Sequence, residues 1–188
     1  MVRAARLLAL VIVFFSVACS EPPNKEMNLA QGAIEAARAA GAERFATDEL
    51  TAAVTALKRS NEAAADKDYR QALSHALDSF ERAQNAAKLA VEGRANARGE
   101  AERAIAQVAT LLTTAESQLK TSPLARNLKA PQDAIRSAGT ALQKSRAALA
   151  KEDYLAVGPA LQGVAARLEA ALTQIDAPPA AAPTRRKR

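Results

Sequence analysis

Apolar residues recur at alternating steps of four and three along most of this chain, and this spacing constrains its fold more than any other feature. One stretch comprises Leu50, Val54, Leu57, Asn61 and Ala64, and the next comprises Tyr69, Leu73, Ala76, Phe80, Ala83, Ala87 and Ala90. Steps that average about 3.5 residues place each set in a narrow stripe along one side of an α-helix. Such stripes are typical of antiparallel helices that pack at a shallow angle.

Alanine occupies most of the apolar positions, and alanine is also the best helix former. No run of alternating β-branched residues indicates a strand. Helices that contact one another through alanine side chains can pack closely, and Leu, Val and Ile supply occasional larger side chains at these contacts. We therefore predict an all-α protein in which antiparallel helical hairpins form an elongated helical bundle, with a long central helix and disordered termini.

Turn and capping residues divide this body into helices. The first helix is expected over residues 27–40, with Gly41 directly after its end. Thr47 is expected to cap the second helix, and Asp68 the third. The third helix is expected to run for roughly 50 residues through Gly93 and Gly99, each of which costs ~1 kcal/mol relative to alanine. A break at these glycines is the alternative.

The later part of the chain predicts two more stripes. The first comprises Ile135, Ala138, Leu142, Ser145 and Leu149, and the second comprises Leu161, Val164, Leu168, Leu172 and Ile175. Asp153 is expected to cap the last helix, and Gly158-Pro159 to kink it or delay its regular part.

A segment of the first half recurs in the second half at a constant offset of 85 residues. Nine of the seventeen positions from Ala53 to Tyr69 are identical to those from Ala138 to Tyr154. Shared composition alone would give about two or three identities, so a repeated helical hairpin is the preferred interpretation. Asp68, Tyr69, Asp153 and Tyr154 are then the turn residues: Asp caps a helix and Tyr packs its ring across the hairpin. Two tyrosines that line a binding groove are the alternative.

The region from Ala36 to Leu50, together with Lys67 to Ala72, resembles the Ala-rich bacterial lipoproteins catalogued as domain of unknown function 4398. The family pattern is Gly-Ala, then aromatic-Ala-Pro-Glu-Leu, then Tyr-x-x-Ala, and Thr47 stands where its Pro is common. The resemblance covers about residues 27–120, and the hairpin is also distantly similar to tetratricopeptide repeats. The resemblance to the lipoprotein family implies envelope localisation and helical hairpins, and it implies no known activity.

The start of the chain has the order of a secretory signal peptide. Two arginines precede an apolar run over residues 7–15, and small residues follow up to Cys19. The apolar run is shorter than the ~20 residues that a transmembrane helix needs. We predict that residues 1–18 are a signal peptide, cut between Ala18 and Cys19.

Ser16-Val17-Ala18-Cys19 resembles the lipobox of bacterial lipoproteins, although Ser16 stands where lipoboxes usually have Leu. The resemblance implies that the thiol of Cys19, the only cysteine, carries the lipid. Several acyl chains anchor a protein stably, whereas one binds only marginally. Cleavage without lipidation and an uncleaved anchor are the alternatives. Ser20 stands in place of the Asp that signals inner-membrane retention, so the resemblance implies the outer membrane, with the body facing the periplasm.

These features divide the chain into five parts. They are a signal peptide (1–18), the lipidated cysteine with a spacer (19–26), a first helical hairpin region (27–120), a second hairpin (121–176) and a Pro/Ala linker with a basic tail (177–188).

The net charge of +6 comes from the two ends of the chain. Arg3 and Arg6 precede the cleavage site, and Arg185, Arg186, Lys187 and Arg188 end the sequence. Without them, basic and acidic residues both number twenty. The body therefore lacks the basic face of a nucleic-acid-binding protein. The terminal cations on a Pro/Ala arm would suit anionic cell-wall or lipopolysaccharide groups, or be a solvated tail without a partner.

The sequence contains no group of residues that would form a catalytic site. His75 is the only histidine, without clustered metal ligands or an acid partner, and its preferred interpretation is a surface imidazole. No catalytic residue, metal site or cofactor is predicted beyond the covalent lipid on Cys19. The expected function is a non-catalytic scaffold or adaptor that presents helical hairpins to an envelope protein or to peptidoglycan. The alternative is a periplasmic module that binds a small ligand between helices, and Ala-rich stripes also favour pairing between copies of the chain.

Overall fold

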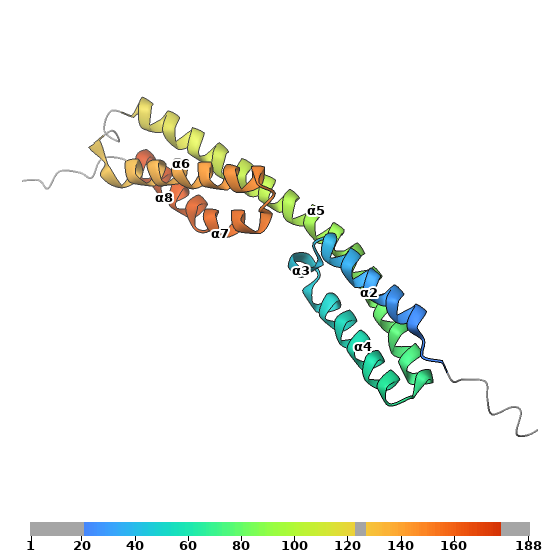
Figure 1. Ribbon diagram of the computed structural model, residues 1–188. Coiled ribbons are helices and arrows are strands. Elements are labelled where there is room, and N and C mark those ends of the chain that lie inside the picture. The colour runs from blue at the N-terminus through green and yellow to red at the C-terminus, as the bar shows by residue number, and fades with distance from the viewer. Residues whose placement is uncertain (1–20, 123–126, 178–188) are drawn as a thin grey trace, which may run out of the picture. The chain divides into compact units, whose positions relative to one another are not determined.

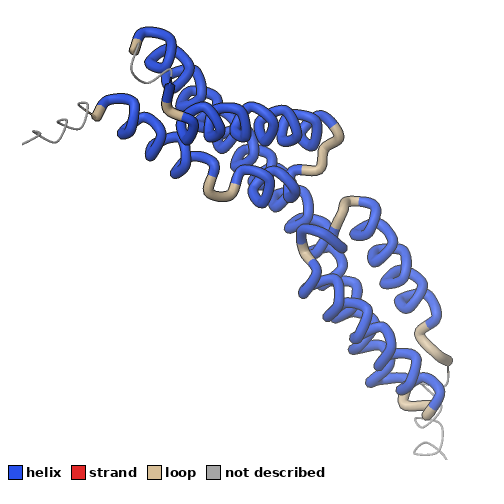
Figure 2. Tube along the Cα trace, turned by 90° about the vertical axis from the view of Figure 1, so that its left-hand side faces the viewer, coloured by secondary structure: helices blue, strands red, loops and turns tan. Residues whose placement is uncertain are grey.

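The computed structural model describes residues 21–122 and 127–177, and within these ranges every regular element is a helix (Figures 1 and 2). The all-α prediction is therefore confirmed. The elements are α2 (Asn24–Ala39), α3 (Ala42–Phe45), α4 (Thr47–Ala65), α5 (Tyr69–Thr121), α6 (Lys129–Ala150), the 3-10 helix η3 (Tyr154–Ala156), α7 (Val157–Leu161) and α8 (Val164–Asp176).

The long central helix is also confirmed, because α5 is a single α-helix of 53 residues that passes both glycines without a break. At Gly93 another segment of the chain comes close to the backbone of α5. A Cβ atom added there would lie 3.1 Å from Cβ of Phe45 and 3.2 Å from its carbonyl oxygen. Because glycine has no Cβ, the Phe45 backbone can lie against α5 at this position. A Cβ added to Gly99, by contrast, would meet no atom within 4 Å.

The chain forms two compact units that divide between Arg94 and Ala95. The sequence analysis grouped residues 27–120 in a first hairpin region and residues 121–176 in a second hairpin, and that grouping stays a prediction. The second half of α5 carries a buried stripe of its own, which includes Ile105, Val108 and Leu112. We call residues 21–94 the first unit and the described residues from 95 to 177 the second unit.

The core of the first unit consists mainly of alanine. The buried stripe of α5 contains only small residues, at alternating steps of four and three: Ala72, Ala76, Ser79, Ala83, Ala86 and Ala90. Ala30 and Ile34 of α2 and Leu50 and Leu57 of α4 belong to the same buried cluster as the last three alanines. The small side chains along this stripe of α5 let the larger side chains of α2 and α4 pack close to its backbone.

The predicted stripes of α4 and α5 had the right spacing, but about half of their positions were wrong. Val54 is 38 % exposed and Leu73 is 37 % exposed, whereas the neighbouring Ala53 and Ala72 are 0 % exposed. Asn61 is exposed and Ser60 is buried. The prediction favoured larger or bulkier side chains, while the closely packed contact selects the small residues one position earlier.

Two buried serines of this core bond across the α4–α5 hairpin. The Ser60 hydroxyl on α4 donates to the carbonyl oxygen of Ala72 on α5 at 2.7 Å. In the other direction, the Ser79 hydroxyl on α5 donates to the carbonyl oxygen of Ala53 at 2.8 Å. Both side chains are fully buried, so the two bonds satisfy hydroxyl groups that water cannot reach.

The second unit buries larger side chains. The stripe of α5 continues there through Ala101, Ile105, Val108, Leu112 and Ala115, and α6 packs against α7 and α8. The buried residues of α8 are Val164, Leu168, Ala171 and Ile175, which confirms most of the predicted stripe, although Leu172 is only half-buried.

Several helix boundaries differ from the sequence prediction. Gly41 lies after α2 with φ 92° and donates its N–H to the Arg38 carbonyl, as expected for a helix-terminating glycine. Thr47 does not cap α4: it is the first residue of that helix, and its hydroxyl donates to the Glu43 carbonyl. Nor does Asp153 cap the last helix, because α8 begins only after Gly163, which has φ 69°.

Two further expectations lie outside the described residues. The signal peptide with Ala18 and Cys19 precedes residue 21, and the basic tail lies beyond residue 177. No helix in the described part of the chain is both long and apolar enough to cross a membrane.

Candidate functional site

The two predicted turns share a backbone geometry, although neither contains a glycine. Lys67 has φ 62°, and Glu152, which lies 85 residues later, has φ 58°. In the first turn the N–H of Lys67 donates to the Ala64 carbonyl at 3.1 Å, and the N–H of Asp68 donates to the Ala63 carbonyl at 2.9 Å. These two bonds form a Schellman motif, which satisfies the last carbonyls of a helix.

The second turn repeats both bonds at the same offset of 85 residues. Glu152 donates to the Leu149 carbonyl at 3.0 Å, and Asp153 donates to the Ala148 carbonyl at 2.9 Å. The sequence repeat therefore corresponds to a repeated helix end. The turns lead into different elements, since the long α5 begins directly at Tyr69 whereas only the short η3 begins at Tyr154.

The four turn residues have different environments in the two units. Asp68 accepts the N–H of Gln71 at 3.0 Å, but no side-chain bond from Asp153 caps η3. Tyr69 is half-buried and Tyr154 is 7 % exposed. The pKa of Arg98 on α5 is raised, first by its hydrogen bond to Glu102 and then by smaller electrostatic effects of Tyr154 and Glu152.

Replacing either left-handed residue, Lys67 or Glu152, with glycine is expected to stabilise its unit by about 0.5–1 kcal/mol. A side chain with positive φ carries a steric cost of ~1 kcal/mol, and the greater freedom of glycine in the unfolded chain offsets part of the gain. Urea unfolding of each variant measures the change. Lys58→Gly, inside α4, is the control and should destabilise by about 1 kcal/mol. Destabilisation by Lys67→Gly would show that its side chain contributes more than the strain it carries.

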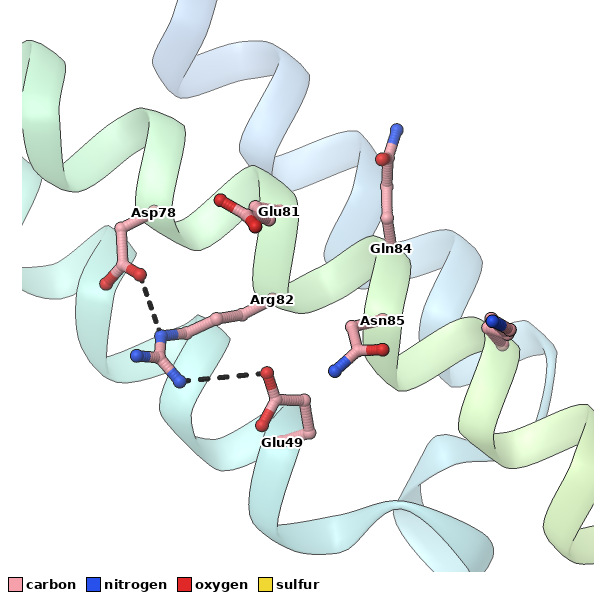
Figure 3. Close-up of a pocket in the computed structure, with 7 residues that line it drawn as sticks. Glu49, Asp78, Glu81, Arg82, Gln84 and Asn85 are labelled. Carbon is pink, nitrogen blue, oxygen red and sulfur yellow. Dashed lines mark hydrogen bonds and ion pairs between the residues drawn. The ribbon is translucent and has the colours of Figure 1, made fainter.

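A groove with a volume of about 660 Å³ lies along α4 and α5 in the first unit. Its lining is polar: Glu49, Asp78, Glu81, Arg82, Gln84, Asn85 and Lys88. Figure 3 shows the Arg82 side chain between the carboxylates of Asp78 and Glu49. The Arg82 Nε lies 2.9 Å from Asp78 Oδ1, and Nη1 lies 3.7 Å from Glu49 Oε1.

This groove continues on one side into a smaller one of about 340 Å³, which shares Asp78 and Arg82 and adds Asp48 and Arg59. Side chains of both charge signs therefore cover the surface of this hairpin. The lining of the larger groove includes no Ser, Cys or His that would serve as a nucleophile with a neighbouring base. Partly exposed ion pairs of this kind contribute little to stability, and they suit recognition of a polar surface.

The other sequence candidates are dispersed. His75 is half-buried on α5. Neither of these two grooves is lined by His75, Tyr69 or Tyr154. Within residues 21–122 and 127–177, no three His, Cys, Asp or Glu side chains are grouped so that they could hold a metal ion. The lipidation candidate Cys19 and the cations of Arg185, Arg186, Lys187 and Arg188 are not among the described residues.

No protein-family model matches this chain, and neither the curated proteins nor the solved structures contain a match. Its function must therefore be argued from its own residues.

The Arg82 cluster is the feature of this site that sequence reasoning missed. Asp78 and Arg82 stand four residues apart, which is a recognisable ion-pair spacing within one helix. Glu49, however, lies on the preceding helix, and only the register of α4 against α5 brings it to Arg82. Alternating charges on two helices gave no signal of which pairs would meet.

Proposed function

We propose that the protein is a lipid-anchored protein of the bacterial cell envelope that works as a non-catalytic scaffold or adaptor. One observation carries the proposal: Cys19, the only cysteine, comes directly after small residues at the end of a segment with two cations and an apolar run. That arrangement supports export, cleavage before Cys19 and acylation of its thiol. Ser20 supports the outer membrane as the destination, with the helices facing the periplasm.

The start of the fold is compatible with such a tether. Helix α2 begins at Asn24, five residues after Cys19, and five extended residues span at most about 18 Å. The first unit would therefore be held close to the bilayer. Its α4–α5 surface carries the polar groove around Arg82, which would be available to an envelope partner.

Changing Cys19 to alanine is expected to abolish membrane attachment. Cells that express the full chain are labelled with palmitate and fractionated, and the intact mass of the mature protein is measured. The wild-type protein should carry label in the membrane fraction, and Cys19→Ala should lose the label and leave the membrane. Ser20→Asp, which keeps the cysteine, should retain the label and move to the inner membrane. Unlabelled wild-type protein with a free thiol would contradict the proposal.

The adaptor role is tested on the tail, whose cations would bind anionic cell-wall groups. Purified protein is sedimented with isolated peptidoglycan at low and high salt. The wild-type chain should sediment at low salt and be released at high salt, because screening weakens contacts between exposed charges. A variant with glutamine at Arg185, Arg186, Lys187 and Arg188 should sediment less at low salt. Equal sedimentation of the two proteins would rule out this contact.

A further inference from the structure

Three leucines of the first unit lie on its surface near the start of α2. Leu29 of α2 is 51 % exposed, and Leu73 and Leu77 of α5 are 37 % and 52 % exposed. The core of this unit consists mainly of alanine, so these are large apolar side chains that the core does not use. We call Leu29, Leu73 and Leu77 the tether-end leucines, because the predicted lipid tether precedes α2.

The direction of α2 places the tether-end leucines close to the point where the tether would leave. Phe45, which comes soon after α2, lies against Gly93 of α5. Helix α2 therefore ends near Gly93 and runs parallel to α5, as Figure 1 shows. Its 16 residues reach back about 24 Å along α5 from there, at a rise of 1.5 Å per residue. Asn24, where α2 begins, thus lies at about the level of Leu77, and Leu73 lies one turn further on.

An apolar groove between α2 and α5 extends the surface of these leucines. Its volume is about 380 Å³, and Leu29, Gly32 and Ala36 of α2 line it together with Phe80 and Ala87 of α5. Gly32 and Ala36 are exposed, and a Cβ added to Gly32 would meet no atom within 4 Å. The groove therefore adds an open, apolar area to the three leucines.

Basic side chains lie beside the tether-end leucines. Lys25 precedes Leu29 by four residues and Arg70 precedes Leu77 by seven, so each projects from the same side of its helix as that leucine. Both cations are exposed, and neither forms an ion pair in the part of the chain that the structure describes. The acidic Glu81 lies one turn beyond Leu77, away from the start of α5. Exposed leucines beside long basic side chains are typical of a helix that lies on a lipid surface, where the cations extend to the phosphates.

We propose that this end of the first unit lies on the bilayer, with the tether-end leucines inserted between the lipid headgroups. The proposal rests on the proposed acylation of Cys19. The five residues from Cys19 to Asn24 span at most about 18 Å, so the start of α2 stays close to the membrane. The tether gives the leucines a high effective concentration at the bilayer, and a contact too weak to form from solution is then sufficient. A bilayer, unlike a protein partner, requires no matching shape from this surface.

Tryptophan reporters in vesicles test the contact, because the chain contains no tryptophan of its own. The acylated protein is purified from the membrane fraction and reconstituted in vesicles of phosphatidylethanolamine and phosphatidylglycerol, with and without bromine on the acyl chains. The fluorescence of Leu77→Trp should fall at least about twofold in the brominated vesicles, because the indole ring would lie among the lipids. Leu89→Trp is the matched control: Leu89 is 40 % exposed on the same helix, but it projects about 120° away from Leu77. Its fluorescence should stay the same in both kinds of vesicle.

Two results of this comparison would reject the contact. The first is Leu77→Trp fluorescence that bromine does not change, and the second is equal quenching of Leu77→Trp and Leu89→Trp. Far-UV circular dichroism should show the same helix content in both variants, so that a difference in quenching reports on position and not on unfolding.

A second comparison tests whether the leucines themselves hold the unit at the membrane. Leu29→Trp is the reporter, and Leu73→Gln and Leu77→Gln are added to it together. Quenching of the reporter should fall at least about twofold, because two apolar side chains no longer enter the lipid. Leu89→Gln added to the same reporter should leave the quenching unchanged. If the two glutamines on the tether-end side also leave it unchanged, the tether alone holds Leu29 at the bilayer and the proposed contact is wrong.

The intact mass of the purified protein separates failure of this contact from failure of the proposed function. A wild-type mass without acyl groups would contradict the proposed lipid anchor. The reporters are in that case attached to the vesicles through a maleimide phospholipid on the thiol of Cys19, the only cysteine. This supplies a tether at the same residue, and the comparison of Leu77→Trp with Leu89→Trp then decides the membrane contact by itself.

Discussion

Replacing Leu168 with alanine is expected to destabilise the second unit by about 2–5 kcal/mol. Leu168 is 0 % exposed in the buried stripe of α8, and α8 packs along α6. Removing its isobutyl group would leave a cavity among the larger side chains of this unit, and those side chains refill such a space only in part. The loss is a large fraction of the usual stability of a domain, which is about 5–15 kcal/mol.

Hydrogen–deuterium exchange with mass spectrometry is the suitable measurement, because it reports on each unit separately. Peptides from α6 and α8 should lose protection in Leu168→Ala, while peptides from α2 and α4 should keep theirs. Leu155→Ala is the matched control, since Leu155 is 47 % exposed and its removal creates no cavity. Equal effects of the two substitutions would show that Leu168 is not part of a packed core.

Replacing Ala83 with leucine is expected to destabilise the first unit by about 1–3 kcal/mol, or more if the helices cannot separate. Ala83 is 0 % exposed and lies in the cluster that contains Ala53 and Leu57 of α4. The three additional carbon atoms of leucine have no space unless α4 moves away from α5. The same change in hydrophobicity that stabilises many cores would therefore disrupt this one.

The same exchange measurement tests Ala83→Leu, with peptides from α2, α4 and the first part of α5 expected to lose protection. Ala39→Leu serves as the control because Ala39 is an exposed residue of α2, where leucine meets no packed neighbour. Increased protection in Ala83→Leu would show that the space between the helices is larger than their burial indicates.

The type of fold and the long helix could be predicted from local properties of the sequence. High helix propensity continues through Gly93 and Gly99, and the cost of two glycines is small against a helix of 53 residues. The turn after α4 was also recognisable, because the repeat at Asp68 and Asp153 marked the end of a helix twice. In both cases residues close in sequence determine the structure.

The rotation of each helix could not be predicted, because it depends on what the neighbouring helix requires. Hydrophobicity alone favoured Val54 and Leu73, whereas contact with another alanine-rich helix selected Ala53 and Ala72. The cap expected at Thr47 failed for a similar reason: a short preceding helix, α3, supplies a carbonyl to the Thr47 hydroxyl. Neither result could be deduced from the spacing of apolar residues.

The candidate functional features also fall into two groups, those that the sequence shows and those that require the structure. The signal-like segment, Cys19 and the terminal cations are features of the sequence, and palmitate labelling, fractionation and sedimentation with peptidoglycan are the measurements that bear on them. The Arg82 cluster and the exposure of Leu77 on α5 depend on helix register and burial, so they emerge only from the structure.

The side of α5 that faces α4 consists almost entirely of alanine methyl groups, and such a surface carries little information about its own alignment. If α4 slid by one heptad along α5, alanines would again face alanines, and the loss of packing would be small. The two serine hydroxyls remove this ambiguity, because Ser60 reaches the Ala72 carbonyl and Ser79 reaches the Ala53 carbonyl only in the observed alignment. Each such bond contributes about 0.5–1.5 kcal/mol. Two polar atoms in an otherwise uniform interface thus select one alignment among several that the methyl groups alone would accept.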